Sequence, residues 1–357
     1  MIVDRLHSIA HDRYWWTRDQ EVLPVVSIKT DELSERLRDR AVRPQTRQVL
    51  VSLIAGSEQE GDLSEPPNCN GYGRVRHFRY ETPPPWPKNP LPMVPAAQYL
   101  GRPVEEVSNA QVFQNAACNW RCWYCYVPFN LLAANEQHAG WLTAEELVSL
   151  YLAEADRPLV IDCSGGQPDL TPEWIPWMME ALANAGAAEE VYLWSDDNLS
   201  NDYFWRFLSD EQRQLVGTHR SYGRVCCFKG FNEASFAFNT KAAPDLFARQ
   251  FDLFARLLDT GMDLYCYATF TTPQGEGIER DMATFLDRLM ALHPRLPLRL
   301  VPLRIENYGV VQHRVGTEQQ TALALQEQAI LAWNAELAAR FTTQERQLPI
   351  ASISLLE

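Results

Sequence analysis

The sequence lacks a long apolar run and a long basic run, and each absence argues against a class of function. No stretch approaches the roughly 18 apolar residues that a membrane-spanning helix needs. Acidic residues outnumber basic ones by 46 to 32, which gives a net charge of −14. Because phosphate binding depends largely on Lys and Arg, nucleic acid is not expected as a main partner. The first residues, Met1 to Trp16, mix charged and apolar side chains, unlike a signal peptide. We therefore expect a cytoplasmic protein with no membrane partner.

The eight cysteines, in a chain without a secretion signal, indicate metal or redox chemistry and not a disulfide framework. Three of them, Cys118, Cys122 and Cys125, follow one another at C-x3-C-x2-C spacing. Thiolates this close repel one another unless a cation offsets their charge. Structural zinc normally takes four protein ligands, whereas iron–sulfur clusters are held by tight cysteine runs. Three ligands on a four-iron cluster leave one iron open to a non-protein ligand.

From about residue 110 the sequence alternates strand and helix patterns. We expect six strands, at 111–117, 159–163, 191–194, 224–228, 263–270 and 298–305. Helices are expected after the capping box of Thr143 and Glu146, from Thr171 to Gly186, and from Pro244 to Thr260. Alternation of this kind predicts an α/β fold with parallel strands joined by right-handed crossovers. Chemistry in such folds gathers at the carboxyl ends of the strands.

The segments on either side of this region are less regular. Before it we expect strands at 22–29, 46–55 and 72–80, and a helix at 31–42 capped by Thr30 or Asp31. A proline-rich strap at 83–95 is expected to run extended across the rest of the protein. After it we expect a helix to about residue 340, capped by Thr317 and Gln320. The predicted division is an α+β extension at 1–100, the strand–helix region at 101–310 and a helical segment at 311–357.

Two motifs in this order resemble those of the radical S-adenosylmethionine (radical SAM) superfamily. The first is the cysteine triplet, with Tyr124 as the aromatic residue before its last cysteine. The second is Gly165-Gly166-Gln167-Pro168, about forty residues downstream, where the family carries Gly-Gly-Glu-Pro. The resemblance implies a partial, TIM-like (β/α)6 barrel over roughly 110–310. It also implies an enzyme that uses a [4Fe–4S] cluster and S-adenosylmethionine to make a 5′-deoxyadenosyl radical.

The resemblance assigns roles to several residues. Cys118, Cys122 and Cys125 would hold the cluster, and Tyr124 would contact the adenine. The Gly165–Pro168 segment would contact the methionyl amino group, although Gln167 lacks the charge of the usual Glu. Further cofactor contacts are expected from polar residues after the third strand, namely Ser195, Asp197 and Asn198. Lys229 follows the fourth strand, and we expect it to meet a carboxylate of S-adenosylmethionine or of the substrate.

Other interpretations stay open on the sequence alone. The triplet could be a structural zinc site completed by Cys69 or a histidine. The protein could be an activase that installs a radical on a partner protein, or a non-catalytic iron–sulfur or zinc protein. No cysteine follows Cys266, so no auxiliary-cluster extension is evident. The favoured interpretation is an enzyme acting on a peptide or a small metabolite, served by an electron donor such as flavodoxin or ferredoxin.

Overall fold

A computed structural model describes residues 27–355 and contains a mixed α/β fold built on a seven-stranded sheet. The strand order is β10-β9-β8-β7-β6-β4-β3. The strands are β3 (Gly73–His77), β4 (Asn109–Gln114), β6 (Val160–Ser164), β7 (Tyr192–Asp197), β8 (Tyr222–Phe228), β9 (Leu264–Thr269) and β10 (Leu300–Leu303). All neighbours pair in parallel except β3 and β4, which are antiparallel.

The six strands from β4 to β10 confirm the expected parallel set, because they lie side by side in chain order. The sheet is open, since β10 and β3 form its two ends and do not pair with each other. The strand expected at 72–80 is β3, which extends the same sheet from the N-terminal part of the chain.

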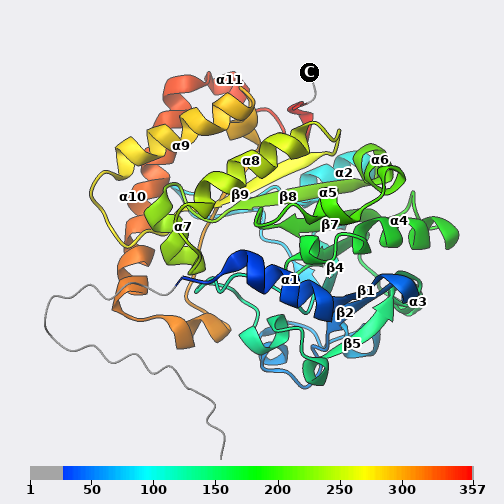
Figure 1. Ribbon diagram of the computed structural model, residues 1–357. Coiled ribbons are helices and arrows are strands. Elements are labelled where there is room, and N and C mark those ends of the chain that lie inside the picture. The colour runs from blue at the N-terminus through cyan, green and yellow to red at the C-terminus, as the bar shows by residue number, and fades with distance from the viewer. Residues whose placement is uncertain (1–26, 356–357) are drawn as a thin grey trace, which may run out of the picture.

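Helices cover one face of the sheet and the ends of its strands (Figure 1). They are α3 (Ala144–Ala153), α4 (Trp174–Asn184), α5 (Tyr203–Phe207), α6 (Asp210–Thr218), α7 (Glu233–Thr240), α8 (Leu246–Leu258), α9 (Ile278–Leu292), α10 (Thr317–Arg340) and α11 (Thr343–Arg346). The main core lies between this layer and the sheet, where aromatic rings such as Phe228, Phe285 and Trp333 are buried against one another. The expected helices are present as α3, α4, α8 and α10, whereas α5, α6, α7 and α9 were not predicted.

The starts of α3, α4 and α10 differ in how closely they follow the capping signals of the sequence. The capping box at Thr143 and Glu146 is confirmed at the start of α3. Helix α4 begins at Trp174, after a 3-10 turn, and not at Thr171. The capping box expected at Thr317 and Gln320 is wrong: the N-cap of α10 is Gly316, which has no side chain, and only its backbone N–H donates to the Gln319 side chain.

A second, three-stranded antiparallel sheet has the order β1-β2-β5, formed by β1 (Val42–Arg43), β2 (Gln48–Ser52) and β5 (Ala139–Thr143). Helix α1 (Thr30–Ala41) precedes it, as expected. The expected cap was wrong: Thr30 is the first helical residue, and Lys29 at the cap makes no side-chain capping bond. Of the strand expected at 22–29, residues 22–26 lie outside the described residues, and Ile28 forms only an isolated bridge with Ala242.

The proline-rich strap covers the other face of the sheet together with α2 (Met93–Leu100). Leu91 and Met93 are completely buried among inward-facing side chains of the strands. Trp86 is also buried, and its indole nitrogen donates to Glu327 on α10 at 2.9 Å. The expectation of an extended segment as far as residue 95 was wrong at its end, because α2 begins at Met93. Pro95 fits there because the first turn of a helix does not need its N–H.

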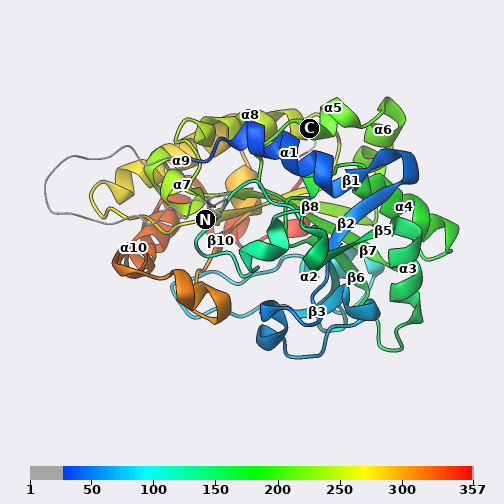
Figure 2. The same cartoon turned by 60° about the horizontal axis from the view of Figure 1, so that its bottom comes forward.

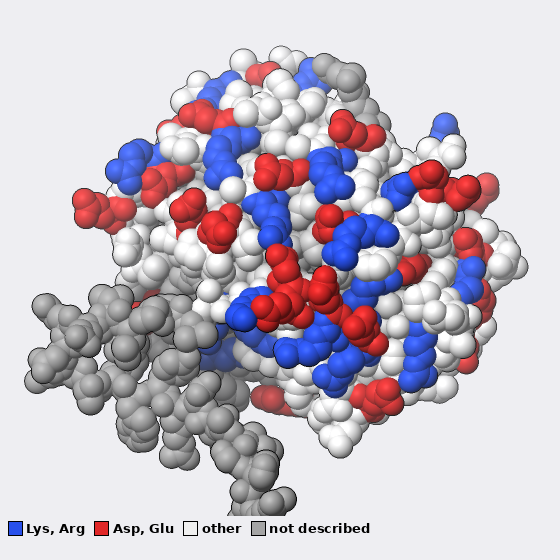
Figure 3. Space-filling model, in the orientation of Figure 1, with Lys and Arg blue, Asp and Glu red and all other residues white. Residues whose placement is uncertain are grey.

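The surface carries charges of both signs. On the face shown in Figure 3, Lys and Arg side chains alternate with Asp and Glu and form no continuous basic area. Among residues 27–355, no helix combines the length and the apolar character needed to cross a membrane.

The buried position of Trp86 predicts that the strap is structural. Trp86→Ala should lower the free energy of unfolding by about 3–5 kcal/mol, because it removes a large buried side chain. It should also expose the Thr82–Ala96 segment to limited proteolysis. Trp86→Phe keeps most of the buried area and should cost clearly less. Rapid cleavage of the parent protein in this segment, leaving an active remainder, would show instead that the strap is only a tether.

Candidate active site

The loop that follows β4 carries the three clustered cysteines, all of them half-buried and free of disulfides. Asn119 fixes this loop, because its buried amide nitrogen lies 2.8 Å from Ser34 Oγ on α1 and 2.7 Å from Ser200 Oγ. Nearby, the indole nitrogen of Trp120 donates to Thr30 Oγ1 at 3.2 Å. The N-terminal helix therefore supports the cysteine loop directly.

The three thiols lie close enough to act on one another electrostatically. Burial, and then the neighbouring Cys118 and Cys125, raise the pKa of Cys122 to about 12, while Lys229 opposes the shift. Burial and Cys118 likewise raise the pKa of Cys125. A thiol in such a setting stays protonated unless a cation stabilises its thiolate.

A single metal ion and an iron–sulfur cluster place different demands on the three cysteines. Across residues 27–355, no three Cys, His, Asp or Glu side chains are gathered into a group that could hold one ion. The cysteines of a four-iron cluster bind different irons, so their sulfurs surround the cluster and do not meet at one point. Cys69, the fourth ligand of the zinc alternative, is buried next to Glu154, which also accepts a hydrogen bond from its backbone N–H.

The second motif lies against the cysteine loop at the end of β6. A Cβ at Gly166 would come within 2.3 Å of the Asn115 carbonyl oxygen and 2.4 Å of that of Ala117. Gly165 has φ +86°, and a Cβ there would collide with the Gln114 side chain. Both glycines are thus required by the packing of two loops of this chain, whether or not a ligand also approaches them.

Gln167 joins the loops that follow three neighbouring strands. Its backbone N–H donates to Ala117 O at 2.7 Å in the cysteine loop. Its side-chain amide donates to Asp197 Oδ1 at 2.8 Å and accepts from the Asn198 backbone N–H at 2.9 Å. Its side chain is buried, and both ends of the amide are used. A glutamate at this position would place its carboxylate opposite that of Asp197, whereas the amide of Gln167 donates to Asp197.

The polar residues predicted after the third strand differ in their surroundings: Ser195 and Asp197 lie within β7, and only Asn198 follows it. Ser195 lies inside β7 and not after it, and its hydroxyl is 2.7 Å from Tyr222 Oη in the helix-covered core. Asp197 is buried, accepts from the Leu199 N–H at 2.8 Å and faces Arg224 at 3.5 Å. Only Asn198 reaches the cysteine loop.

Asn198 lies directly next to the first cysteine. Its Nδ2 is 3.0 Å from Asn119 Oδ1 and 4.0 Å from Cys118 Sγ, a distance at which it can donate to sulfur. Its Oδ1 is buried and has no hydrogen-bond partner. Groups that donate to a ligating sulfur tune the metal site they surround.

Lys229 and Tyr124 are brought to the same place from different parts of the chain. Burial opposes the charge of Lys229, but Cys227, Tyr124 and Cys122 outweigh it and raise the pKa of the amine well above its usual range. The Tyr124 hydroxyl lies 2.8 Å from Thr269 Oγ1, at the end of β9. The cysteine loop is thereby connected to the far half of the sheet.

The sequence reasoning missed a charged group on the face of the sheet that carries the strap. It consists of Arg74 and Arg76 on β3, Asp162 on β6 and Asp196 on β7. Strand pairing places Arg74 opposite Val112, and Val112 opposite Asp162, so these side chains share one face. The two-residue alternation of side chains along a strand could have revealed part of this group from the sequence. It separates Asp196 from its neighbours Ser195 and Asp197, which face the helices.

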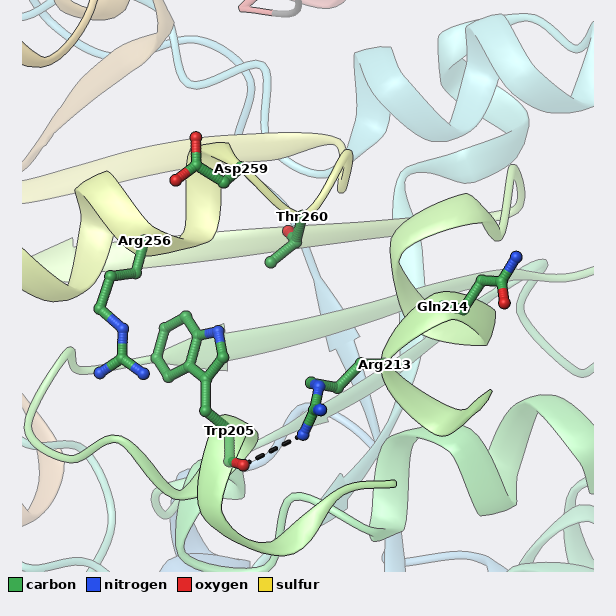
Figure 4. A pocket seen from close by; sticks show the side chains of 6 residues that line it. All are labelled: Trp205, Arg213, Gln214, Arg256, Asp259 and Thr260. Carbon is green, nitrogen blue, oxygen red and sulfur yellow. Dashed lines mark hydrogen bonds between the residues drawn. The ribbon is translucent and has the colours of Figure 1, made fainter. Parts of the chain in front are cut away.

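A surface pocket elsewhere does not belong to this site. It is lined by Trp205, Arg213, Gln214, Arg256, Asp259 and Thr260 (Figure 4). Asp259 and Thr260 precede β9, so they lie at the amino end of that strand, opposite the end that carries the site.

No protein-family description and no curated protein matches the chain. Solved structures of SuiB from Streptococcus suis resemble it weakly. The structure with bound precursor peptide SuiA has a TM-score of 0.36, and the structure with bound S-adenosylmethionine has 0.35. Identity is 14% in both, over 51% and 50% of this chain. The match spans 36% of the SuiB chain, just over a third of its length. A likeness of this degree carries no weight for the function of this chain.

The bonds of Gln167 predict a pH-dependent defect in Gln167→Glu. Two buried carboxylates would then face each other, so the folded state should hold a proton that the unfolded state releases near pH ~4.3. The variant's stability relative to the parent should fall as pH rises above that value, until the raised pKa of the folded state is passed. Denaturant unfolding at a series of pH values measures this.

Gln167→Leu is the control for this prediction. It removes the same hydrogen bonds, at a cost of about 1–3 kcal/mol, but adds no titrating group. Its defect should therefore be the same at each pH. An equally flat profile for Gln167→Glu would mean that Gln167 and Asp197 are not in contact.

Proposed function

We propose that the protein is a radical SAM enzyme acting on a peptide or small-metabolite substrate. Its open parallel sheet would then be the partial (β/α)6 barrel of that superfamily. With a [4Fe–4S] cluster and S-adenosylmethionine bound, such a site supplies a 5′-deoxyadenosyl radical that abstracts hydrogen from the substrate. An external electron donor such as flavodoxin or ferredoxin would serve it.

One observation supports the proposal above the others: the loops that carry the separate motifs touch one another. Gln167 binds the cysteine loop through Ala117, and Asn198 lies beside Cys118 and Asn119. A structural zinc knot would require only the cysteines and would leave these contacts without a role.

The residues around the cysteines have separable tasks in this proposal. Cys118, Cys122 and Cys125 would hold the cluster, and Asn198 would donate to one of its sulfur ligands. Trp120 and Trp123 are buried on either side of Cys122 in sequence, and in this proposal they would help to keep water from the cluster. This exclusion matters because a reactive intermediate must be protected from stray hydrogen donors.

Lys229 and Tyr124 would act on the cofactor and not on the cluster. The cationic amine of Lys229 suits a carboxylate of S-adenosylmethionine or of the substrate. The Tyr124 ring packs edge-on against Trp123, with centroids 5.7 Å apart, which fixes its position next to the cysteines for an adenine contact.

The cluster assignment predicts the effect of removing single thiols. Anaerobically reconstituted parent protein should hold one four-iron cluster, and Cys118→Ala, Cys122→Ala and Cys125→Ala should each lose its visible absorbance and iron. Cys163→Ala is the matched control, since Cys163 is buried in the main core and should leave the iron content unchanged. Stoichiometric zinc without iron-dependent absorbance would refute the assignment.

The position of Lys229 predicts a defect in cofactor use with an intact cluster. Lys229→Met should keep the iron content but weaken carboxylate binding, lowering 5′-deoxyadenosine formation at limiting S-adenosylmethionine by roughly 10-fold or more. The exposed Lys241→Met serves as the control. Unchanged product formation in Lys229→Met, at every cofactor concentration, would show that Lys229 does not bind the cofactor.

A further inference from the structure

The strap-covered face of the sheet contains buried polar atoms that no part of the described chain satisfies. They include Arg74 Nε, Arg74 Nη2, Tyr126 Oη and Asp162 Oδ1. Arg74 is 6% exposed and Asp162 is fully buried. Leaving buried polar atoms without partners costs free energy, so a cluster of them calls for a specific explanation.

The four atoms belong to one place beside the cysteine loop. The guanidinium of Arg74 lies over the ring of Tyr126, 5.2 Å from its centroid, and Tyr126 directly follows Cys125. The charges of Arg74 and Arg76 both act on Tyr126 and on Asp162. Asp162 uses its other oxygen to accept from Arg76 at 3.3 Å. Ser164, two residues further along β6, approaches Asp162 without the geometry of a full hydrogen bond.

The pattern of unused atoms specifies a ligand chemistry. Nε and Nη2 form the side edge of a guanidinium, whose two parallel N–H groups match the two oxygens of a carboxylate. Asp162 Oδ1, a few side chains away on the same face, needs a donor such as an amine, an amide N–H or a hydroxyl. Neither requirement is met by a neighbouring group in the described chain.

We propose that this group is the substrate-binding site, and that the substrate presents a carboxylate to Arg74 and a hydrogen-bond donor to Asp162. An α-amino acid group, free or at the end of a peptide, has this combination. The proposal rests on the proposed function for its identification of the ligand as substrate. It places the bound carboxylate next to the loop of Cys118, Cys122 and Cys125.

Binding of small probes to the full-length, anaerobically reconstituted protein tests this directly. Glycine carries both groups, acetate only the carboxylate, and glycinamide only donors in place of the acid. Calorimetric titration should rank their affinities as glycine, then acetate, then glycinamide. Equal binding of glycine and glycinamide, or no binding of any probe at millimolar concentration, would overturn the proposal.

Variants of the two residues separate the contributions. Arg74→Met should lower the affinities for acetate and glycine roughly 10- to 100-fold. Arg74→Lys should recover only part of that loss, because a lysine lacks the paired N–H groups. Asp162→Asn should lower the affinity for glycine toward the affinity for acetate. Arg79→Met, whose side chain is 86% exposed, is the control and should bind like the parent.

Two alternatives have distinct outcomes. If Arg74 only stabilises the fold through Asp162, Arg74→Met will melt well below the parent and glycine will not raise the melting temperature of the parent. If the carboxylate belongs to S-adenosylmethionine, Arg74→Met will lose cofactor binding and substrate-free 5′-deoxyadenosine formation. Either result overturns the proposal. Glycine binding in a protein that forms no cluster would instead contradict the proposed function alone.

Discussion

The side-chain amide of Gln167 is the contact on which the candidate site depends. It binds Asp197 and Asn198 at the end of β7, while the backbone N–H of the same residue donates to Ala117 in the loop after β4, so loops from β4, β6 and β7 meet at Gln167. An amide can serve here because it donates at one end and accepts at the other. The carboxylate it meets is in turn held near Arg224, which lies 3.2 Å from Asp169 and 3.5 Å from Asp197. The site thus lies above a buried ionic group, one arginine between two aspartates, that is situated between the sheet and its helices.

Helix α1, in the N-terminal part of the chain, contacts the two motif loops from the outside of the molecule. On α1, Ser34 accepts from Asn119 of the cysteine loop, and Arg38 forms a buried ion pair with Glu173 and donates to the Leu170 carbonyl at 3.1 Å. One helix therefore braces both motif loops. Figure 2 shows α1 running along the side of the molecule near α5 and β1. The division of the chain at residue 100 remains a prediction, since β3 and α1 both form part of the structure around the site.

The strands could be predicted because each is short, apolar and bounded by turn residues, as at Val191 to Trp194. Helix α9 was missed although Ile278, Met282 and Phe285 recur at helical spacing, and no side-chain capping signal precedes it, since Gly277 stands at its N-cap. The assignment of the motif residues to a site stays a prediction, and the charged group of Arg74, Arg76, Asp162 and Asp196 was not predicted. Side chains at a strand end were grouped by sequence, whereas the pleat divides them, so Asp196 was overlooked between Ser195 and Asp197. Arg74 could not be found, because its neighbours come from pairing between distant segments.

Strand β3 is an edge strand, antiparallel to its neighbour and bonded on one side only. A strand in this position can change sequence without disturbing any crossover between the parallel strands. Arg74 and Arg76 belong to it, while the cysteines belong to the loop after β4. In the proposed site, changes among the five residues of β3 would alter the contact to a carboxylate, and would leave Asp162 on β6 and the cysteine loop as they are.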